Sequence, residues 1–343
     1  MVPVVEENLG KLKVPDGRVL VTGAGGFIGS TLCRALLDHG CRDLAGLDLG
    51  PAPGDLAGML EWYRGDITDP ESCRSAFTGV SCIFHLAALA TDWAPRRVFG
   101  RINHQGTANV IELCRRAGVR RLVHMSTLAV HPFRGYRDAD ESAPVGNRIN
   151  GYCESKAAAE RLVNQIHGGD GLETTIVRPG AIIHGPGDTT AFVHLAPVLM
   201  KGSMPLVAGG RVLACYSDAR NLVRGLVLAA GPAGAGETFV ITDDVRITLR
   251  EYLEQVAAEL GTEVRFYSVP RAVAQAGGVV LELLWKLAGS RRPPPVHRYR
   301  VGLVSRDFHF GCEKAKRLLG YRPVIDFARS IRDTARWYLA LNT

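Results

Sequence analysis

Short apolar runs alternate with segments of helical periodicity along the first two-thirds of the chain. Runs rich in Val, Ile, Leu and Phe, typical of buried parallel strands, lie at residues 19–22, 44–48, 60–64, 81–88, 121–127, 174–180 and 238–242. Helical segments are expected between them, at residues 30–37, 102–117 and 221–230 and from Tyr152 onward. Strands and helices that alternate at this spacing predict an α/β fold with a doubly wound parallel sheet.

A glycine turn separates the first predicted strand from the first helix. It carries Gly23, Gly26 and Gly29, and helix-forming sequence follows without a gap. Gly23 permits a tight turn, Gly26 lets the backbone approach phosphate oxygens, and Gly29 lets the helix pack against the strand. A glycine turn without a ligand can give the same pattern, but the flanking strand and helix favour a dinucleotide pyrophosphate site.

An acidic residue follows the second predicted strand. Asp48 lies 19 positions beyond Gly29, close to the separation expected for a carboxylate that binds the adenosine ribose. A carboxylate there repels a 2′-phosphate, and no Arg or Lys follows until Arg64, so NAD is favoured over NADP. The alternative is a turn aspartate that caps residues 49–51.

The alternation weakens after Ile182, which predicts a smaller second lobe. Residues 248–260 have a cap and helical periodicity, whereas residues 238–242 return to the sheet. We expect a dinucleotide-binding Rossmann domain formed by residues 17–184 and 212–243, and a substrate-binding lobe formed by residues 185–211 and 244–343.

A phenol and an ammonium group are expected on one helix face. Tyr152 and Lys156 are four residues apart, so their side chains lie one above the other. A phenol with a pKa of about 10 becomes a useful base near pH 7 only if its pKa falls by about three units, or roughly 4 kcal/mol. Lys156 and an oxidised nicotinamide are the cations available for this. Thr127, at the end of a sheet strand, is a candidate to hold the reacting oxygen, and Ser126 is a second candidate.

Composition and charge exclude several other classes. The chain has 343 residues, 46% hydrophobic and 22% charged, which is typical of a globular protein. The net charge of +7 is scattered, so a solvated basic surface is favoured over nucleic-acid binding. Eight cysteines without a CxxC pair predict buried thiols in a reducing compartment, with no disulfide or metal site. Residues 1–15 lack a hydrophobic signal core and no run is long enough to span a membrane, so a cytoplasmic protein is expected.

Together, these motifs resemble extended short-chain dehydrogenases/reductases of the NAD-dependent epimerase/dehydratase group. The matching stretches are Thr22-Gly23-Ala24-Gly25-Gly26-Phe27-Ile28-Gly29, Gly65-Asp66-Ile67-Thr68-Asp69, His85-Leu86-Ala87-Ala88, Asn103-x-x-Gly106-Thr107, Met125-Ser126-Thr127, Tyr152-x-x-x-Lys156 and Arg178-Pro179-Gly180. The resemblance implies an NAD-dependent oxidoreductase with Thr127, Tyr152 and Lys156 as its catalytic set.

The same resemblance implies the residues that hold the cofactor. Asp66 and Ile67 would lie beside the adenine, Ala87 beside a ribose, and Asn103 near the strand ends. Lys156 would also bind the nicotinamide ribose. The full set implied for the cofactor is Gly23, Gly26, Phe27, Ile28, Gly29, Asp48, Asp66, Ile67, Ala87, Tyr152, Lys156 and Pro179. The resemblance also implies a homodimer that pairs through the helices near residues 102–117 and 152–167.

The second half resembles the branch that contains 3β-hydroxysteroid and sterol 4-carboxylate dehydrogenases. The resemblance is carried by residues 239–244, 248–252, 298–303, 308–310 and 314–321. It implies a bulky hydrophobic substrate, steroid-like or a 3-hydroxy or 3-oxo compound. Two alternatives stay open: a nucleotide-sugar 4-epimerase with the same Thr-Tyr-Lys set, and a non-catalytic dinucleotide-sensing regulator. Leu128 and Ala129 replace the acidic pair of a 4,6-dehydratase, which argues against dehydration.

Residues 272–289 form an apolar helix whose only charged residues are Glu282 and Lys286. We expect it to be the wall or lid of a lipophilic pocket. A plain packing helix and an interfacial membrane helix are the alternatives. The cleft beside Trp93, His184 and Arg211 is expected to indicate by its polarity whether the substrate is a sterol or a sugar.

Overall fold

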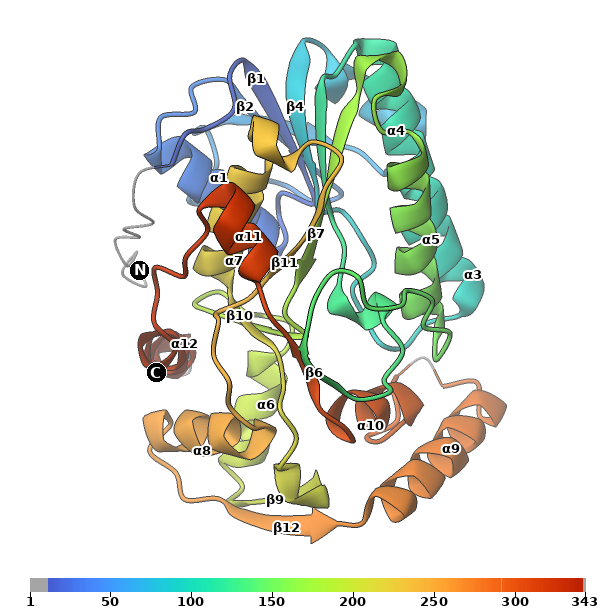
Figure 1. The fold of residues 1–343 in the computed structure, drawn as a ribbon, viewed down its shortest axis with the longest axis vertical. Helices are drawn as coiled ribbons and strands as arrows, with labels where there is room; N and C mark the ends of the chain where they lie inside the picture. Colours follow the sequence, from blue (N-terminus) through green and yellow to red (C-terminus); the bar gives the residue numbers. More distant parts are fainter. Residues whose placement is uncertain (1–11, 291, 342–343) are drawn as a thin grey trace.

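The computed structural model describes residues 12–290 and 292–341, so most of the N-terminal stretch, Arg291 and residues 342–343 lie outside it. Within this part, seven parallel strands form the central sheet, in the order β11-β7-β5-β4-β1-β2-β3 (Figure 1). The strands are β1 (Arg18–Thr22), β2 (Leu44–Asp48), β3 (Glu61–Arg64), β4 (Val80–His85), β5 (Arg121–Met125), β7 (Glu173–Pro179) and β11 (Thr238–Ile241). The predicted doubly wound α/β sheet is confirmed.

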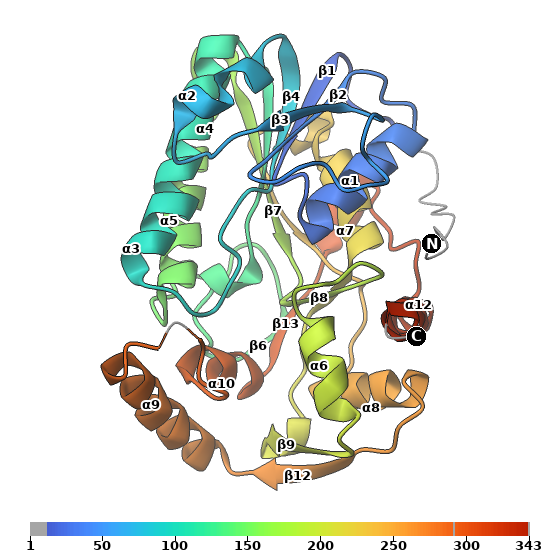
Figure 2. The ribbon, with the colours of Figure 1, turned by 180° about the vertical axis from the view of Figure 1, so that it is seen from behind.

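Helices cover both faces of this sheet (Figures 1 and 2). One layer consists of α1 (Phe27–Asp38), α7 (Ala219–Ala229) and α11 (Glu313–Leu319), and the other of α2 (Pro70–Cys73), α4 (Gly106–Ala117) and α5 (Gly151–Gln165). Side chains alternate across β1: Val19 and Val21 join the core of the first layer, whereas Leu20 joins that of the second. Burial on both faces explains why the strands are apolar without interruption.

The chain reverses its direction of travel across the sheet at β1. It runs from β1 through β2 to β3, then crosses to β4 on the other side of β1. In such a sheet, ligands bind outside the carboxyl ends of the strands at this switch point. The residues that directly follow β1, β4, β5 and β7 therefore meet at one edge.

A second, smaller layer of structure faces that edge. Its elements are α6 (Phe192–Leu199), α8 (Leu249–Glu259), α9 (Arg271–Leu287), α10 (Arg298–Val304), α12 (Phe327–Leu341) and the parallel pair β9 (Ser203–Val207) and β12 (Arg265–Val269). The short parallel pair β8 (Ile182–His184) and β10 (Tyr216–Asp218) joins this lobe to the sheet. α11 follows α10 in sequence but packs against β11, so the chain returns to the sheet before it ends in α12 of the lobe.

A strand that the sequence did not indicate lies between β5 and α5. β6 (Tyr136–Ala139) pairs in parallel with β13 (Phe308–Phe310), about half the chain away. The pairing buries an aromatic cluster in which Tyr136 contacts both phenylalanines of β13. The loop therefore attaches the sheet edge to the lobe.

All eight cysteines are free and buried, which confirms the predicted thiols. Burial raises the pKa of Cys33 and of Cys82 to about 12, so both are protonated and unreactive near neutral pH. In the described part of the chain no group of His, Cys, Asp and Glu is arranged to hold a metal ion. No described helix is both long and apolar enough to cross a bilayer.

Candidate functional site

The glycine turn presents an open helix N-terminus at the switch point. Gly23 has φ +72°, and a Cβ there would lie 2.8 Å from the backbone nitrogen of Ala87. A Cβ on Gly29 would lie 1.9 Å from the carbonyl oxygen of Gly23, so only glycine allows α1 to pack this closely. The N-cap residue of α1, Gly26, makes no side-chain cap bond, and the first turn of this fully described helix holds no acidic residue. The turn thus leaves N–H groups and the positive end of the helix dipole for an anion.

Asp48 closes this turn from the end of β2. Its Oδ2 accepts a hydrogen bond from the Gly25 nitrogen at 2.8 Å, and its Oδ1 accepts one from the Leu49 nitrogen at 2.7 Å. The carboxylate is half-buried beside the turn, where it can also accept hydrogen bonds from ribose hydroxyls. An uncapped helix N-terminus beside a fixed carboxylate fits a dinucleotide.

Tyr152 lies at the start of α5 and faces Thr127, just beyond β5. The Thr127 hydroxyl is close enough to lower the pKa of the Tyr152 phenol, and Thr127 Oγ1 accepts a hydrogen bond from the Ala129 nitrogen at 3.1 Å. The phenol ring packs edge-on against Phe99, with ring centroids 6.2 Å apart, and against Tyr299 at 6.4 Å. The phenol therefore points into the protein.

The environment of this phenol differs from the sequence expectation in one respect. Burial raises the pKa of Tyr152 to about 12, and only the hydrogen bond from Thr127 lowers it. The chain alone does not bring the pKa toward neutrality, because the Lys156 ammonium is directed elsewhere. A base near pH 7 at this position would need a further positive charge, which an oxidised nicotinamide would supply.

Lys156 is buried one turn along α5 from Tyr152. Its Nζ donates to the carbonyl oxygen of Met125 at 2.7 Å and, at the outer limit of a hydrogen bond, to His124 Nε2 at 3.5 Å. Burial lowers the pKa of Lys156 to about 8. Two of the three ammonium protons are thus engaged, and the third remains for a ligand or for the phenolate.

Two buried histidines lie behind Lys156, and His124 was missed by the sequence analysis. Thr107 Oγ1 donates to the Asn103 carbonyl at 2.7 Å, so it accepts from His85 Nε2 at 3.0 Å. His85 Nδ1 then accepts from Thr22 Oγ1 at 2.8 Å. Burial lowers the pKa of His85 to about 3 and that of His124 well below its usual range, so both rings are neutral. His85 and His124 lie at matching positions near the ends of the neighbouring strands β4 and β5, where they are register partners. Their positions near the ends of two predicted strands could have indicated from the sequence that the two rings lie close together.

Asn103 fixes the backbone that follows β4. It lies in a π-helical turn, η2 (Gly100–Gln105), where its amide accepts from the Leu89 nitrogen at 2.7 Å and donates to the Leu89 oxygen at 3.2 Å. It also donates to Ser155 Oγ at 3.1 Å, which links the β4 edge to α5.

Ser126, the second hydroxyl candidate, is buried and its Oγ has no hydrogen-bond partner among the described residues.

The other residues expected at the cofactor site lie at strand ends or beside the turn. Ala87 follows β4 and donates its N–H to Thr22 Oγ1 at 3.3 Å. Pro179 ends β7, and Asp66 and Ile67 follow β3. Phe27 and Ile28 open α1. Their contacts with a cofactor remain a prediction.

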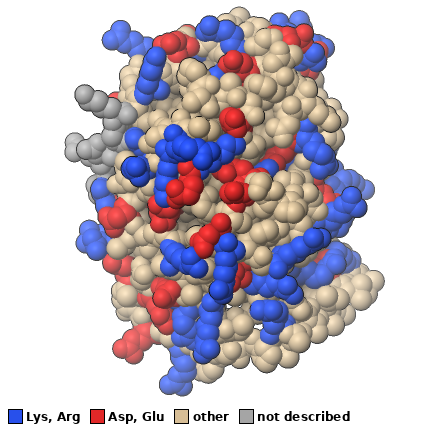
Figure 3. All heavy atoms as spheres, in the orientation of Figure 1, with Lys and Arg blue, Asp and Glu red and all other residues tan. Residues whose placement is uncertain are grey.

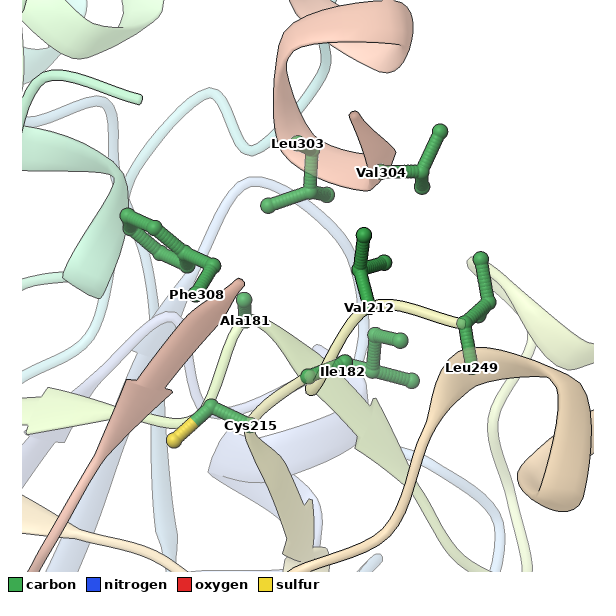
Figure 4. A pocket seen from close by; sticks show the side chains of 9 residues that line it. Ala181, Ile182, Val212, Cys215, Leu249, Leu303, Val304 and Phe308 are labelled. Atoms are coloured by element: carbon green, nitrogen blue, oxygen red, sulfur yellow. The ribbon is translucent and has the colours of Figure 1, made fainter. Parts of the chain in front are cut away.

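Two cavities border α10, where the sheet edge meets the lobe. The first is lined only by apolar side chains and Cys215 (Figure 4). Its lining residues are Ala181, Ile182, Val212, Ala214, Cys215, Leu249, Leu303, Val304 and Phe308. The second has a volume of about 270 Å³ and adjoins Tyr152 through Gly151 and Tyr299. Trp93 and Pro95 also line this second cavity.

The second cavity also contains charged groups, but they neutralise one another. Asp92 pairs with Arg300 at 2.6 Å, Glu282 pairs with Lys286 at 2.5 Å, and Arg96 pairs with Glu154. The space that remains is bounded by aromatic and aliphatic surface together with these satisfied pairs. It can admit a bulky, weakly polar molecule.

The expectation that His184 borders the cleft is wrong. His184 is fully buried and stacks on Tyr252, with ring centroids 5.8 Å apart, inside the core of the lobe. Arg211 lines neither cavity, and Ala214 lines the apolar one. Of the three residues expected at that cleft, Trp93 lines the second cavity, whereas His184 and Arg211 do not. His184 lies on β8, which directs its side chain into the packed interior.

Comparison with known proteins agrees with this geometry. A model of the NAD dependent epimerase/dehydratase family matches residues 19–242. The chain is 33% identical to a 2-alkyl-3-oxoalkanoate reductase of Stenotrophomonas maltophilia, covering 92% of this chain and 97% of the relative. It is 31% identical to a 3β-hydroxysteroid dehydrogenase/Δ5→4-isomerase of Mycobacterium tuberculosis, with 95% and 91% covered. A crystal structure of the dTDP-glucose 4,6-dehydratase DesIV of Streptomyces venezuelae, with NAD and TYD bound, superposes with a TM-score of 0.75 at 28% identity over 94% of this chain and 97% of that chain.

Proposed function

The chain belongs to the NAD-dependent epimerase/dehydratase family and is an NAD-dependent oxidoreductase of the extended short-chain type, and from this premise we propose its substrate and its catalytic residues. The substrate is a secondary alcohol or ketone on a bulky, largely apolar molecule, steroid-like or a 3-hydroxy or 3-oxo compound. The observation that carries the proposal is that Tyr152 faces Thr127 beside buried Lys156, next to a cavity with aromatic walls. The two relatives described above are named for reactions of oxo or hydroxy groups.

In this mechanism Tyr152 exchanges one proton with the substrate oxygen. NAD, when bound, accepts or delivers the hydride. During ketone reduction the phenol gives its proton to the oxygen that develops negative charge, and during oxidation the phenolate takes the hydroxyl proton. Thr127 Oγ1 holds the same oxygen by a hydrogen bond, and the free N–H of Lys156 stabilises the phenolate.

The cofactor is held by the edge of the sheet. The pyrophosphate would be held at the turn beside Gly26 by the N–H groups of Phe27, Ile28 and Gly29, and Asp48 would accept hydrogen bonds from the adenosine ribose hydroxyls. Lys156 and Tyr152 would hold the nicotinamide ribose, and Ala87, Pro179, Asp66 and Ile67 would line the rest of the cofactor site. We assign residues 17–184 and 212–243 to this cofactor domain, and residues 185–211 and 244–343 to the substrate lobe.

A nucleotide-sugar substrate is disfavoured by the lining of the cleft. No arginine is among the described residues that line the apolar cavity, where Ala214 lies, and the cations that line the second cavity, Arg96 and Lys286, are paired with Glu154 and Glu282. Sugar dehydration is disfavoured because the buried residues Leu128 and Ala129 follow Thr127 and neither can transfer protons. The epimerase alternative would also require the cofactor to remain bound throughout the cycle.

A panel assay tests the substrate class. Purified protein with NAD is mixed with hydroxysteroids, 3-hydroxyacyl compounds and UDP-sugars, and reduced-cofactor absorbance is followed. We expect turnover of lipophilic alcohols with release of NADH. Turnover of nucleotide sugars alone, with NAD that stays bound through purification, would reject the proposal in favour of the epimerase.

Asp48→Asn is expected to relax the preference for NAD. The variant removes the charge that repels a 2′-phosphate and keeps one acceptor for the turn. We expect the ratio of kcat/KM with NAD to that with NADP to fall about tenfold to a hundredfold, which corresponds to roughly 1.4–3 kcal/mol. The control is Asp38→Asn at the exposed end of α1, which should leave the ratio unchanged. An unaltered ratio in Asp48→Asn would show that this carboxylate only caps the turn.

We also place the protein in the cytoplasm as a homodimer that pairs through α4 and α5. Both helices lie along one outer side of the sheet, on the opposite side from α1 and α12 (Figure 1). The molar mass in solution, measured by light scattering during gel filtration, distinguishes this dimer from a monomer.

A further inference from the structure

α9 presents a large apolar face to the outside of the protein. Its large apolar side chains Val273, Val279, Val280, Leu283, Leu284 and Leu287 are between 50% and 76% exposed. At 100° per residue they fall within one broad face, to which Ala272, Ala276 and Gly277 also belong, and no charged residue lies within it. An exposed apolar face of this kind marks a surface that another phase or molecule covers.

The opposite face of α9 explains how the helix is held. Ala274, Gly278 and Glu282 are buried against α10, and a Cβ on Gly278 would lie 3.3 Å from Val301 Cγ2. Glu282 accepts from the Arg298 guanidinium at 2.7 Å and from Lys286. The helix is thus fixed along one side, and its apolar face is left at the periphery of the lobe (Figures 1 and 2).

Lys286 lies at the edge of this face, Arg298 and Arg300 lie beside α9 on α10, and the acidic partners of these three side chains are more buried. The side chains of Lys286, Arg298 and Arg300 are 45–56% exposed, whereas the acids they pair with, Glu282 and Asp92, are 10–18% exposed. Figure 3 shows the lower right of the molecule, where α9 lies in Figure 1, as a tan surface with Lys and Arg beside it. The outward charge around the apolar face is therefore positive.

We propose that α9 is an interfacial helix that inserts its apolar face into the headgroup region of an anionic phospholipid surface, with the basic border on the lipid phosphates. Apolar insertion and attraction of basic side chains to anionic lipid act together in such helices. A second copy of the chain fits this surface less well. In a two-fold contact the patch would meet itself, and the two positive borders would face each other.

This inference rests on the proposed function and deepens it by naming the source of the substrate. The cavity beside Tyr152 is lined by Glu282 and Lys286 of α9, and Trp93 Nε1 donates to the Ser290 oxygen at the end of that helix at 3.2 Å. An apolar molecule dissolved in the bilayer would enter the cleft along α9 without crossing water.

Vesicle flotation tests the proposal and needs no turnover, so its result is independent of the proposed reaction. The full chain is mixed with vesicles of 70% phosphatidylcholine and 30% phosphatidylglycerol, or of phosphatidylcholine alone. We expect the protein to float with the anionic vesicles, at least fivefold less with neutral ones, and less at high salt. A protein that stays at the bottom with anionic vesicles would overturn the proposal.

Substitutions identify the surface involved. The triple variant Val280→Glu, Leu283→Glu and Leu287→Glu changes only exposed side chains and should lose at least tenfold in vesicle binding. The matched control Met59→Glu, Met200→Glu and Leu341→Glu changes equally exposed apolar side chains elsewhere and should bind as the unmodified chain does. Circular dichroism checks that both fold. Equal binding by both variants, or a triple variant altered only in oligomeric state, would overturn the membrane assignment, the latter in favour of a second copy.

Discussion

Tyr152→Phe should lower kcat by a factor of about 10²–10⁴ while leaving NAD affinity within about twofold, because it removes only the proton donor. The phenylalanine ring keeps the edge contacts with Phe99 and Tyr299, so the local packing is retained. Steady-state rates measure kcat, and quenching of protein fluorescence by added NAD measures the NAD affinity. The control is Tyr267→Phe, an exposed tyrosine on β12 that also loses a hydroxyl.

The pH dependence gives an independent reading of the same group. Oxidation requires phenolate, so its kcat/KM should rise with pH as the phenol ionises, whereas reduction uses the phenol, which stays protonated through neutral pH. The alkaline rise should be lost in Tyr152→Phe. Turnover of this variant within threefold of the unmodified enzyme would reject the proton-transfer assignment.

Lys156→Met should abolish more than 99% of activity and yet make the folded protein more stable at pH 7. Burial lowers the pKa of Lys156 from 10.5 to about 8, which corresponds to a cost of about 3 kcal/mol for holding the ammonium inside. The variant is freed of this cost, but it also loses the hydrogen bond to the Met125 carbonyl oxygen, which lowers the free energy of unfolding by about 1 kcal/mol. A net increase of about 2 kcal/mol in the free energy of unfolding is expected, so stability has been exchanged for function at this position.

The sign of this effect can be checked through pH. The folded-state pKa lies below the unfolded-state value, so the unfolded chain binds more protons between about pH 8 and 10.5. Stability of the unmodified protein should therefore gain a rising contribution from Lys156 in that window, with the full cost present below pH 8. Urea midpoints measured across this range should lose that contribution in Lys156→Met and keep it in the control Lys201→Met, which changes an exposed lysine. A Lys156→Met protein less stable at pH 7 would contradict the buried ammonium.

The sheet and the site edge were predictable because their signals are local. The run from Val19 to Gly29 combines a buried strand, a turn that only glycine permits and a helix start within eleven residues. Asp48, Thr127 and Tyr152 could be placed because the carboxyl ends of parallel strands meet at one edge. The spacing between these residues therefore predicts proximity.

The remaining features depend on contacts between distant segments. Nothing near Tyr136 indicates a strand, because its partner Phe308 lies in the lobe. The residues next to His184 in the sequence do not distinguish a buried position from a cleft position. Only its contacts with the distant residues Tyr252 and Phe327 show that it lies in the interior. The direction of Lys156 toward Met125 and His124 depends on the depth of α5 against the sheet, which helical spacing alone does not give.

The most direct test of the account is to follow one hydrogen atom. The alcohol from the panel that reacts fastest is prepared with deuterium on its carbinol carbon and incubated with the protein and NAD, and the NADH is analysed by mass spectrometry. We predict one deuterium in NADH for each ketone formed, because Tyr152, Thr127 and Lys156 act on the oxygen of the carbon that loses hydride. Label that stays on the organic substrate, with no net NADH, would contradict the account.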